Sequence, residues 1–315
     1  MAQYLVTGGG GFIGSHLVRA LLERGDAVRV FDNFSTGRRS NLADVASDVD
    51  VQVGSITDPA AVASAMRGVE YVLHQAAIPS VARSVEQPHE CHENNVTGTL
   101  NVLEAARDAG VRKVVYAASS SAYGNAAVSP KHEALPPAPM SPYAAAKLAG
   151  EQYCRVWTQV YGLPTVALRY FNIFGPRQDP ESLYAAVIPR FITRMLRGEA
   201  PTINGDGSQS RDFTYVANVV RANLLACAAD ERADGQVMNI ACGEAYTLLE
   251  LVAAINGILG TTIEPTHGPA QIGDVRHSLA AIERAHDLIS YTPQVGFAEG
   301  LQRTVESLTH LVAVE

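Results

Sequence analysis

Short apolar runs alternate with longer segments of helical periodicity along the first half of the chain. The run 3–7 is followed by Leu17, Val18, Leu21 and Leu22, which would lie on one face of a helix. Further strand-like runs occur at 27–31, 49–54, 71–74, 114–118 and 165–168. Because strands that alternate with helices pair in parallel, this order predicts an α/β fold with a doubly wound parallel sheet. Ligands of such sheets bind at the carboxyl ends of the strands.

The pattern changes after Arg169, where prolines interrupt the chain. The elements predicted there are helices at 185–197, 216–229 and 247–259, a strand at 237–241 and two more helices near the end. We expect one domain at 1–169 and a smaller, mixed α/β domain at 170–315, with 213–241 returning to the first. No repeat or linker separates the halves, so a ligand cleft between them is expected.

The composition limits the classes of partner. The chain has 315 residues, of which 47% are hydrophobic and 18% charged, and its net charge is −8. No basic run offsets this charge, so no nucleic-acid partner is expected. No apolar run is long enough for a membrane span and no signal-peptide pattern is found, so we expect a cytoplasmic protein. The four cysteines lack Cys-x-x-Cys spacing and 89–92 is no standard metal motif, so no metal is expected.

A glycine-rich turn follows the first strand, with Gly8, Gly11 and Gly14 spaced three residues apart. Glycines allow the backbone to approach a pyrophosphate, whose charge is favoured at a helix N-terminus. Asp32 ends the second strand about 20 residues later, where its carboxylate can accept from an adenosine ribose 2′-hydroxyl. The same carboxylate repels a 2′-phosphate, so NAD is expected rather than NADP. The arginines at 38–39 leave this choice partly open.

Tyr143 and Lys147 lie four residues apart in a predicted helix that Ser141 and Pro142 begin. At this spacing the phenol and the ammonium share one face. A neighbouring cation lowers the tyrosine pKa from about 10, which would make a general base usable near neutral pH. A solvated helix face can carry the same pair by chance. The catalytic interpretation is favoured by other polar or glycine residues at predicted strand ends, namely Gly14, Asp32, Gln75, Ser119 and Arg169.

With these motifs the chain resembles the extended short-chain dehydrogenase/reductase family over essentially its whole length, and within it the UDP-hexose 4-epimerases. The residues that carry the resemblance are 7–14, 32–33, 94–99, 119–124, the Tyr143/Lys147 pair, 168–172, 211–213 and 273–278. The resemblance implies a Rossmann domain that binds NAD and a second domain that binds a UDP-sugar. It implies an isomerase that inverts C4′ through a 4-keto intermediate.

The resemblance also implies roles in the reaction. Tyr143 would take the proton of the sugar 4′-hydroxyl while C4′ gives its hydride to NAD, and the hydride would return to the other face of the ketone. Lys147 would hydrogen-bond the nicotinamide ribose and, with the cationic ring, keep the phenol acidic. Ser119 would hydrogen-bond the reacting oxygen, with Ser120 as second choice. Because NAD is reduced and reoxidised in every turnover, it should stay bound.

Binding residues follow from the same resemblance. Those implied for the cofactor are Gly8, Gly11, Phe12, Ile13, Gly14, Asp32, Asn33, Thr36, Gly37, Ser55, Ile56, Gln75, Ala76, Ala77, Asn95, Tyr143, Lys147 and Tyr170. Those implied for the substrate are Ser80, Arg83, Ser121, Asn172, Ala186, Val187, Asn204, Arg211, Asp274 and Ser278. Gln271 replaces a usual arginine on the diphosphate, which implies either compensation by Arg276 or Arg211 or weaker UDP binding. Ser55 replaces a usual aspartate at the adenine, which implies modestly weaker NAD binding.

Neighbouring activities of the family need residues that this chain lacks. The 4,6-dehydratases and UDP-glucuronate decarboxylases carry a carboxyl group where this chain has Ser120 and Ser121. UDP-glucuronate 4-epimerases place an arginine where Asp179 aligns, and a second anion there would repel the sugar carboxylate. Arg177 or Arg190 could still serve, so UDP-glucuronate is kept as an alternative. Another UDP-sugar-modifying oxidoreductase of the family is kept as well.

The resemblance also bears on substrate size and assembly. Ser278 aligns with the residue beside the sugar 2′-substituent, and 184–189 resembles the N-acetylhexosamine-acting branch, so UDP-GlcNAc and UDP-GalNAc are expected alongside UDP-Glc and UDP-Gal. A dehydrogenase that exchanges its NAD(H) and a non-catalytic nucleotide sensor are the other classes considered. A homodimer through the helices that begin near Asn95 and Tyr143 is expected, although core packing explains the same apolar stripes.

Overall fold

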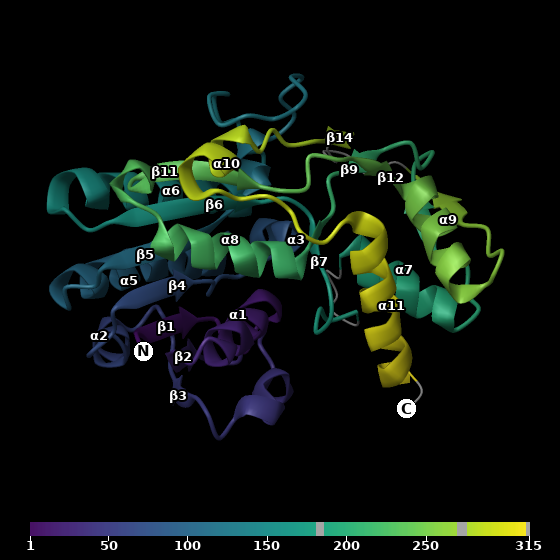
Figure 1. The fold of residues 1–315 in the computed structure, drawn as a ribbon. Coiled ribbons are helices and arrows are strands. Elements are labelled where there is room, and N and C mark those ends of the chain that lie inside the picture. Colours follow the sequence, from purple (N-terminus) through teal and green to yellow (C-terminus); the bar gives the residue numbers. More distant parts are fainter. Residues whose placement is uncertain (181–185, 270–275, 313–315) are drawn as a thin grey trace.

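The structure is a computed structural model that describes residues 1–180, 186–269 and 276–312. Its centre is a seven-stranded sheet in the order β11-β6-β5-β4-β1-β2-β3, in which every pair of neighbours is parallel (Figure 1). The strands are β1 (Gln3–Thr7), β2 (Ala27–Asp32), β3 (Asp50–Val53), β4 (Tyr71–His74), β5 (Lys113–Ser119), β6 (Thr165–Tyr170) and β11 (Gln236–Ile240). The predicted doubly wound parallel fold is confirmed.

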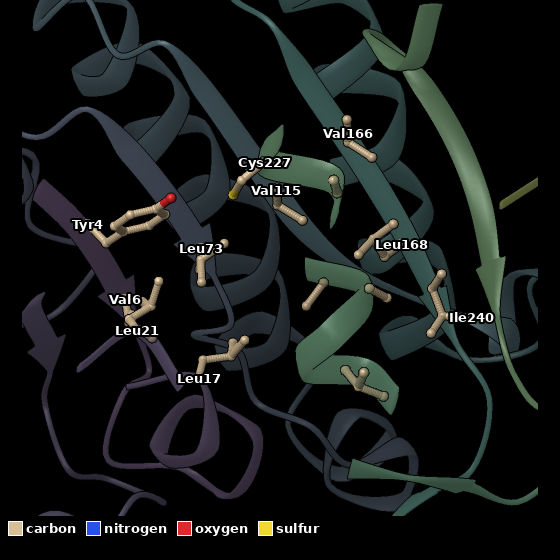
Figure 2. Close-up of a cluster of buried hydrophobic side chains, with 14 of the residues drawn as sticks. Tyr4, Val6, Leu17, Leu21, Leu73, Val115, Val166, Leu168, Cys227 and Ile240 are labelled. Carbon is tan, nitrogen blue, oxygen red and sulfur yellow. The ribbon is translucent and has the colours of Figure 1, made fainter. Parts of the chain in front are cut away.

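Helices cover both faces of the sheet. On one face lie α1 (Phe12–Glu23), α8 (Val216–Ala228) and α10 (Glu283–Ile289), and on the other lie α2 (Pro59–Ala65), α5 (Gly98–Asp108) and α6 (Pro142–Tyr161). Because successive strand residues point to opposite faces, Val6 packs with the first group and Leu5 with the second. Figure 2 shows the first core, where Leu17 and Leu21 of α1 lie over the strand residue Leu73. Each such side chain contributes about 1.5–3 kcal/mol by burial.

A second group of helices lies beside the carboxyl ends of the strands (Figure 1). It consists of α7 (Val187–Leu196), α9 (Leu248–Leu259) and α11 (Phe297–Val312), which share the buried residues Phe191, Ile255 and Leu301. Its short strands are β7 (Ile173–Phe174), β8 (Thr202–Asn204), β9 (Ser210–Arg211), β10 (Thr214–Tyr215), β12 (Tyr246–Thr247), β13 (Thr266–Gly268) and β14 (His277–Ser278). A capping box formed by Thr247 and Glu250 begins α9, which was predicted as a helix at 247–259. The chain therefore places helices and short strands opposite the edge where the Rossmann sheet binds ligands.

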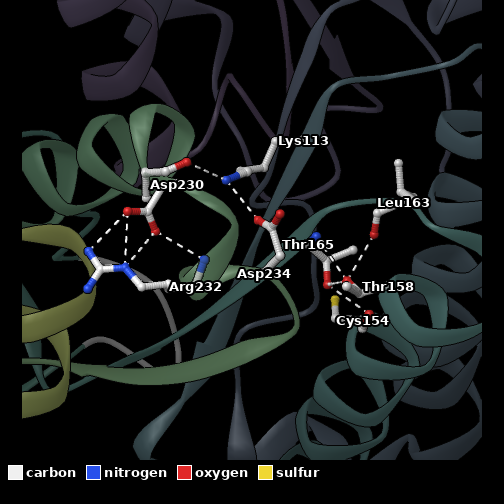
Figure 3. A network of polar contacts seen from close by, with 9 residues as sticks. Lys113, Cys154, Thr158, Leu163, Thr165, Asp230, Arg232 and Asp234 are labelled. Atoms are coloured by element: carbon white, nitrogen blue, oxygen red, sulfur yellow. Dashed lines mark hydrogen bonds and ion pairs between the residues drawn. The ribbon is translucent and has the colours of Figure 1, made fainter.

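The segment from α8 to β11 is fastened to the main sheet by polar contacts, which Figure 3 shows. Lys113 of β5 donates to Ala229 O at 2.7 Å and pairs with Asp234 at 2.8 Å, with both side chains largely buried. The Thr165 hydroxyl of β6 donates to Cys154 O at 2.7 Å and so ties β6 to α6. The two Lys113 contacts hold the chain just before β11, which lies at the edge of the sheet although it follows β6 by more than sixty residues of sequence.

The region before α5 differs most from the sequence prediction. It contains two short helices that were not predicted, α3 (Val81–Glu86) and α4 (Pro88–His92), and the helix expected to begin near Asn95 starts with a π-helical turn (Glu93–Thr97) that leads into α5. Three 3₁₀ segments, Arg39–Val45, Ser120–Tyr123 and Glu231–Ala233, were also unpredicted. No helix within the described residues has the length and apolarity needed to cross a bilayer. The same residues contain no cluster of three or more groups suited to a metal ion.

Candidate active site

The glycine loop and the strand ends enclose a first cavity of about 400 Å³. Every residue predicted for the cofactor lines it except Ser55 and Asn95. Gly8 has a φ of +69°, and a Cβ there would lie 2.7 Å from Ala76 N. A Cβ on Gly14 would meet the carbonyl oxygen of Gly8 and lie 2.8 Å from Gly9 Cα. The loop can thus hold its backbone N–H groups against a ligand at the N-terminus of α1, which fits the diphosphate of a dinucleotide.

Asp32 lies at the end of β2, buried in the wall of this cavity. Its oxygens accept from the backbone N–H of Gly10 at 2.8 Å and of Phe34 at 2.7 Å. Burial raises the pKa of Asp32, and these two hydrogen bonds act in the opposite direction. A carboxylate oriented in this way can accept one more hydrogen bond from a ribose hydroxyl, which fits the adenosine side of NAD.

Asn95 and Ser55 have other partners. Asn95 is buried, accepts from Ile78 N at 2.8 Å and donates to Ile78 O at 3.1 Å, so it supports the loop after β4 from behind. Its neighbour Asn94 lines the cavity instead. The hydroxyl of Ser55 lies 2.8 Å from that of Thr57. The placement of both residues at the cofactor is not supported by the described contacts.

Tyr143 and Lys147 occupy the first two turns of α6, whose N-cap Ser141 accepts from Ala144 N at 3.1 Å. Both side chains line the first cavity. The Lys147 ammonium is buried and donates to Ala117 O of β5 at 2.8 Å. A hydrogen bond joins the Tyr143 phenol to Ser119 at the end of β5. The structure therefore brings together the three residues predicted for proton transfer.

One electrostatic prediction is wrong for this structure. We expected Lys147 to lower the pKa of Tyr143, but burial raises the pKa of Tyr143 and the hydrogen bond with Ser119 opposes this only in part. Burial also lowers the pKa of Lys147 to about 8. Desolvation is the largest effect on this buried phenol, and an acidic phenol requires a further positive charge.

Replacing Lys147 by methionine should stabilise the nucleotide-free protein by about 1–2 kcal/mol at pH 7. The lowered pKa of Lys147 corresponds to about 3 kcal/mol of unfavourable free energy from burying the ammonium, which methionine removes. The loss of the hydrogen bond to Ala117 O offsets about 1 kcal/mol of this gain. Between pH 8 and 10.5 the unfolded wild-type chain binds more protons than the folded one, so wild-type stability rises with pH and the difference shrinks. Denaturant unfolding at pH 7 and pH 10 measures both effects. An unchanged difference would contradict this account.

A polar cluster behind the cavity was not predicted from the sequence. Asn223 of α8 donates to the Tyr170 hydroxyl at 2.8 Å, and the Gln75 amide donates to Asn223 and Tyr170, each at 3.2 Å. Burial raises the pKa of Tyr170 to about 12, so its hydroxyl stays protonated. The cluster orients Gln75 and Tyr170, two cavity residues that lie 95 positions apart, through α8, which the sequence predicted only as a helix at 216–229.

A second cavity, of about 900 Å³, adjoins the first, since Ser80 and Ala186 line both. The other predicted substrate residues in its wall are Asn172, Val187, Asn204 and Arg211. Asn172 has a φ of +41°, a conformation that asparagine adopts more readily than most residues, and donates to Asp212 O at 3.1 Å. Residues that the sequence prediction missed there include Met140, Gln209 and Phe213.

Several predicted substrate residues lie elsewhere. Arg83 lines the first cavity, and its guanidinium donates to both oxygens of Glu90 at 2.7 and 2.9 Å. Ser121 donates to the Ser119 hydroxyl at 2.8 Å. Ser278 is buried on β14 beside Arg211 and lines neither described cavity, so its placement at the sugar is not supported. Asp274, Gln271 and Tyr184 lie outside the described residues.

Asp179 also differs from its prediction. It lines the first cavity and not the second, and it pairs with Arg38 at 2.5 Å. The second anion that we expected against a sugar carboxylate is therefore on the cofactor side. Of the two arginines considered for that carboxylate, Arg190 lines the second cavity and Arg177 the first.

Comparison with known proteins agrees with this geometry, because residues 4–241 match the NAD dependent epimerase/dehydratase family. The chain belongs to this family. It is 40% identical to the UDP-glucose 4-epimerase of Mycolicibacterium smegmatis over 96% of this chain and 97% of that protein. A Thermotoga maritima UDP-glucose 4-epimerase with UDP-glucose has a TM-score of 0.94 at 39% identity, covering 98% of this chain and 99% of that one. The predictions of the family and of NAD as cofactor are confirmed.

Two other solved structures bear on the choice of ligand. A UDP-N-acetylglucosamine 4-epimerase from Methanobrevibacter ruminantium, in complex with UDP-N-acetylmuramic acid, has a TM-score of 0.94 at 39% identity, covering 98% of this chain and 99% of that one. A UDP-glucuronic acid 4-epimerase from Bacillus cereus, carrying a Tyr-to-Phe change, has a TM-score of 0.91 at 31% identity, covering 98% and 99%. The family therefore includes relatives named for three kinds of sugar at similar structural distance.

Proposed function

We propose that this protein interconverts the C4′ epimers of UDP-hexoses, UDP-Glc with UDP-Gal and also UDP-GlcNAc with UDP-GalNAc. The broader class, a UDP-sugar 4-epimerase and hence an isomerase, agrees with the names of its relatives. The observation that carries the proposal is that Tyr143 and Lys147 of α6 come together with Ser119 at the end of β5, beside a glycine-loop cavity that adjoins a second, larger cavity.

The residues of the chain divide the chemistry as follows. When bound in the first cavity, NAD would supply the hydride acceptor and donor for C4′ and, in its oxidised form, a positive charge. Tyr143 removes the 4′-hydroxyl proton and later restores it, with Ser119 hydrogen-bonded to the same phenol. Lys147, fixed by Ala117 O, has two further N–H groups for the phenol side and the nicotinamide ribose. Because burial raises the pKa of Tyr143, both positive charges are needed to form the phenolate.

Inversion at C4′ requires that the 4-keto sugar present its other face before the hydride returns. The second cavity adjoins the one that Tyr143 lines, and its wall combines small residues such as Ala186 with polar ones such as Asn204 and Arg211. Asn172 and Arg211 would hold the diphosphate while the sugar turns. The size of this cavity and the likeness of 184–189 to the N-acetylhexosamine-acting branch support acceptance of N-acetyl sugars, whereas the buried position of Ser278 does not contribute.

UDP-glucuronate is a second candidate substrate, which one observation favours. Arg190 lines the second cavity, and the charge of Asp179 is directed to Arg38 in the first. A carboxylate on C5′ would therefore meet a cation and not the anion that the sequence alignment placed there. A relative named UDP-glucuronate 4-epimerase is 32% identical over 97% of this chain.

One experiment separates these possibilities. The purified protein is incubated with UDP-Glc, UDP-GlcNAc and UDP-GlcA separately, and the C4′ epimers are resolved while absorbance at 340 nm is followed. We expect epimers of the first two without net absorbance change. Accumulation of NADH would identify a dehydrogenase instead, epimerisation of UDP-GlcA alone would select the second candidate, and no turnover with retained nucleotide would identify a sensor.

We also infer a homodimer through α5 and α6. Val156 and Val160 are exposed on α6, at 41% and 66%, and lie four residues apart on one helix face. A second copy of the same helix would cover them in a two-fold interface. Light scattering on the purified protein tests this inference, and the mass of a single chain would contradict it. The cytoplasmic location stays a prediction.

A further inference from the structure

The backbone of Arg38 lies close to Asp32, the residue expected to bind the adenosine ribose. Its backbone N–H donates to Gly10 O at 2.9 Å, and the side-chain amide of Asn41 donates to the same oxygen at 2.9 Å. The N–H of Gly10 in turn donates to Asp32 at 2.8 Å. Gly10 therefore links the backbone of Arg38 to Asp32, the carboxylate expected at the ribose 2′-hydroxyl. In Rossmann proteins an arginine near this position accommodates the 2′-phosphate of NADP.

Neither arginine after Asp32 is directed to that position. The Arg38 guanidinium pairs with Asp179, 141 residues later in the chain, with Nη2 and Oδ2 2.5 Å apart. The Arg39 guanidinium lies over the ring of Phe34, 4.4 Å from its centroid. Arg38 and Asp179 both line the first cavity, whereas Arg39 does not. Of the two arginines that left the choice between NAD and NADP open, Arg38 is therefore the one that lines the cofactor cavity. Its guanidinium is held in an ion pair with Asp179.

We propose that Asp179 helps to select NAD over NADP by holding the Arg38 guanidinium away from the ribose 2′ position. Asp179 is a positioning residue in this role, since it acts through Arg38. Asp32 repels a 2′-phosphate directly, and the pair with Asp179 withholds the cation that would compensate that repulsion. The ion pair is partly exposed, so its effect is modest beside that of Asp32. The proposal concerns the cofactor and holds whichever sugar is the substrate.

Replacing Asp179 by asparagine keeps the shape of the side chain and releases Arg38. Calorimetric titration of nucleotide-free protein with NAD⁺ and with NADP⁺ measures the effect. We expect the Kd for NADP⁺ to fall about twofold to fivefold, which is the upper part of the range for one partly exposed arginine–anion pair. The Kd for NAD⁺ should change less than about twofold, because NAD⁺ carries no group at the 2′ position for Arg38 to bind.

Two further variants test the mechanism. Arg38→Ala combined with Asp179→Asn should lose the gain in NADP⁺ affinity, because the released cation is then absent. Asp50→Asn is the matched control, since it removes the same charge from another exposed arginine pair, Arg29–Asp50, at the amino ends of β2 and β3. It should leave both dissociation constants unchanged, as the carboxyl ends of these strands, and not the amino ends, meet the cofactor.

Three results would overturn the proposal. The ratio of the two dissociation constants could stay at the wild-type value in Asp179→Asn. The gain could persist without Arg38, in which case the lost negative charge and not the freed arginine favours the extra phosphate. The affinity for both dinucleotides could fall equally, in which case the Arg38–Asp179 pair would support the cavity without influencing the choice between NAD and NADP.

Discussion

Replacing Tyr143 by phenylalanine should lower kcat for epimerisation of UDP-glucose about 10³-fold while NAD remains bound. The change removes only the hydroxyl that exchanges the proton with the sugar 4′-oxygen, and proton transfer by a placed side chain contributes about 10²–10⁴-fold. The ring keeps its place on α6, since Tyr143 N still donates to the Ser84 hydroxyl at 3.1 Å. Turnover is measured by resolving the C4′ epimers, and bound nucleotide by its absorbance after denaturation.

Tyr153→Phe is the matched control for this experiment. Tyr153 lies on the same helix, where its ring packs edge-on against Trp157 at 5.7 Å and lines neither cavity. This variant should keep wild-type turnover and bound NAD. If Tyr143→Phe retained a tenth or more of wild-type kcat, the general base would be another group. If it lost NAD, its role would be in holding the cofactor.

The parts of the site that the sequence predicted well are those fixed by local pattern. A strand, a glycine turn and a helix leave little choice in where Gly8, Gly14 and Asp32 lie, because each strand brings its last residue to one edge of a parallel sheet. The Tyr143/Lys147 pair is equally local, being one turn of α6. All five line the same cavity, although Tyr143 and Gly8 are far apart in sequence.

The parts of the site that the sequence predicted poorly depend on the helical geometry of a turn or on contacts between residues far apart in the chain. The resemblance implied Asn95 at the cofactor, but the turn at Glu93–Thr97 is π-helical and places Asn94 in the cavity wall, while Asn95 bonds to Ile78 behind it. Asp179 meets Arg38 across 141 residues. The raised pKa of Tyr143 follows from burial, which no spacing of residues reveals.

Replacing Gly14 by alanine should lower NAD affinity about 100-fold or more and destabilise the protein by about 2 kcal/mol. Alanine favours the helix by about 1 kcal/mol, but its Cβ would meet Gly8 O and lie 2.8 Å from Gly9 Cα. Gly8 O already accepts from Gly11 N at 3.0 Å, so the loop has no side chain to yield and must separate from α1. Such overpacking costs about 1–3 kcal/mol or more, and a shift of about 1 Å in a positioned group can cost about 10²-fold. Calorimetric titration with NAD⁺ and denaturant unfolding measure the two effects.

Gly257→Ala separates the steric effect from helix propensity. Gly257 lies within α9, and a Cβ there would have no atom within 4 Å. The same substitution should therefore stabilise the protein by about 0.5–1 kcal/mol and leave NAD affinity unchanged. The two substitutions change stability in opposite directions because backbone atoms occupy the position of the new methyl group at Gly14 but not at Gly257. If both variants were stabilised and kept NAD, α1 would have room to move away from the glycine loop, and the close approach of backbone to diphosphate would not be what holds the cofactor.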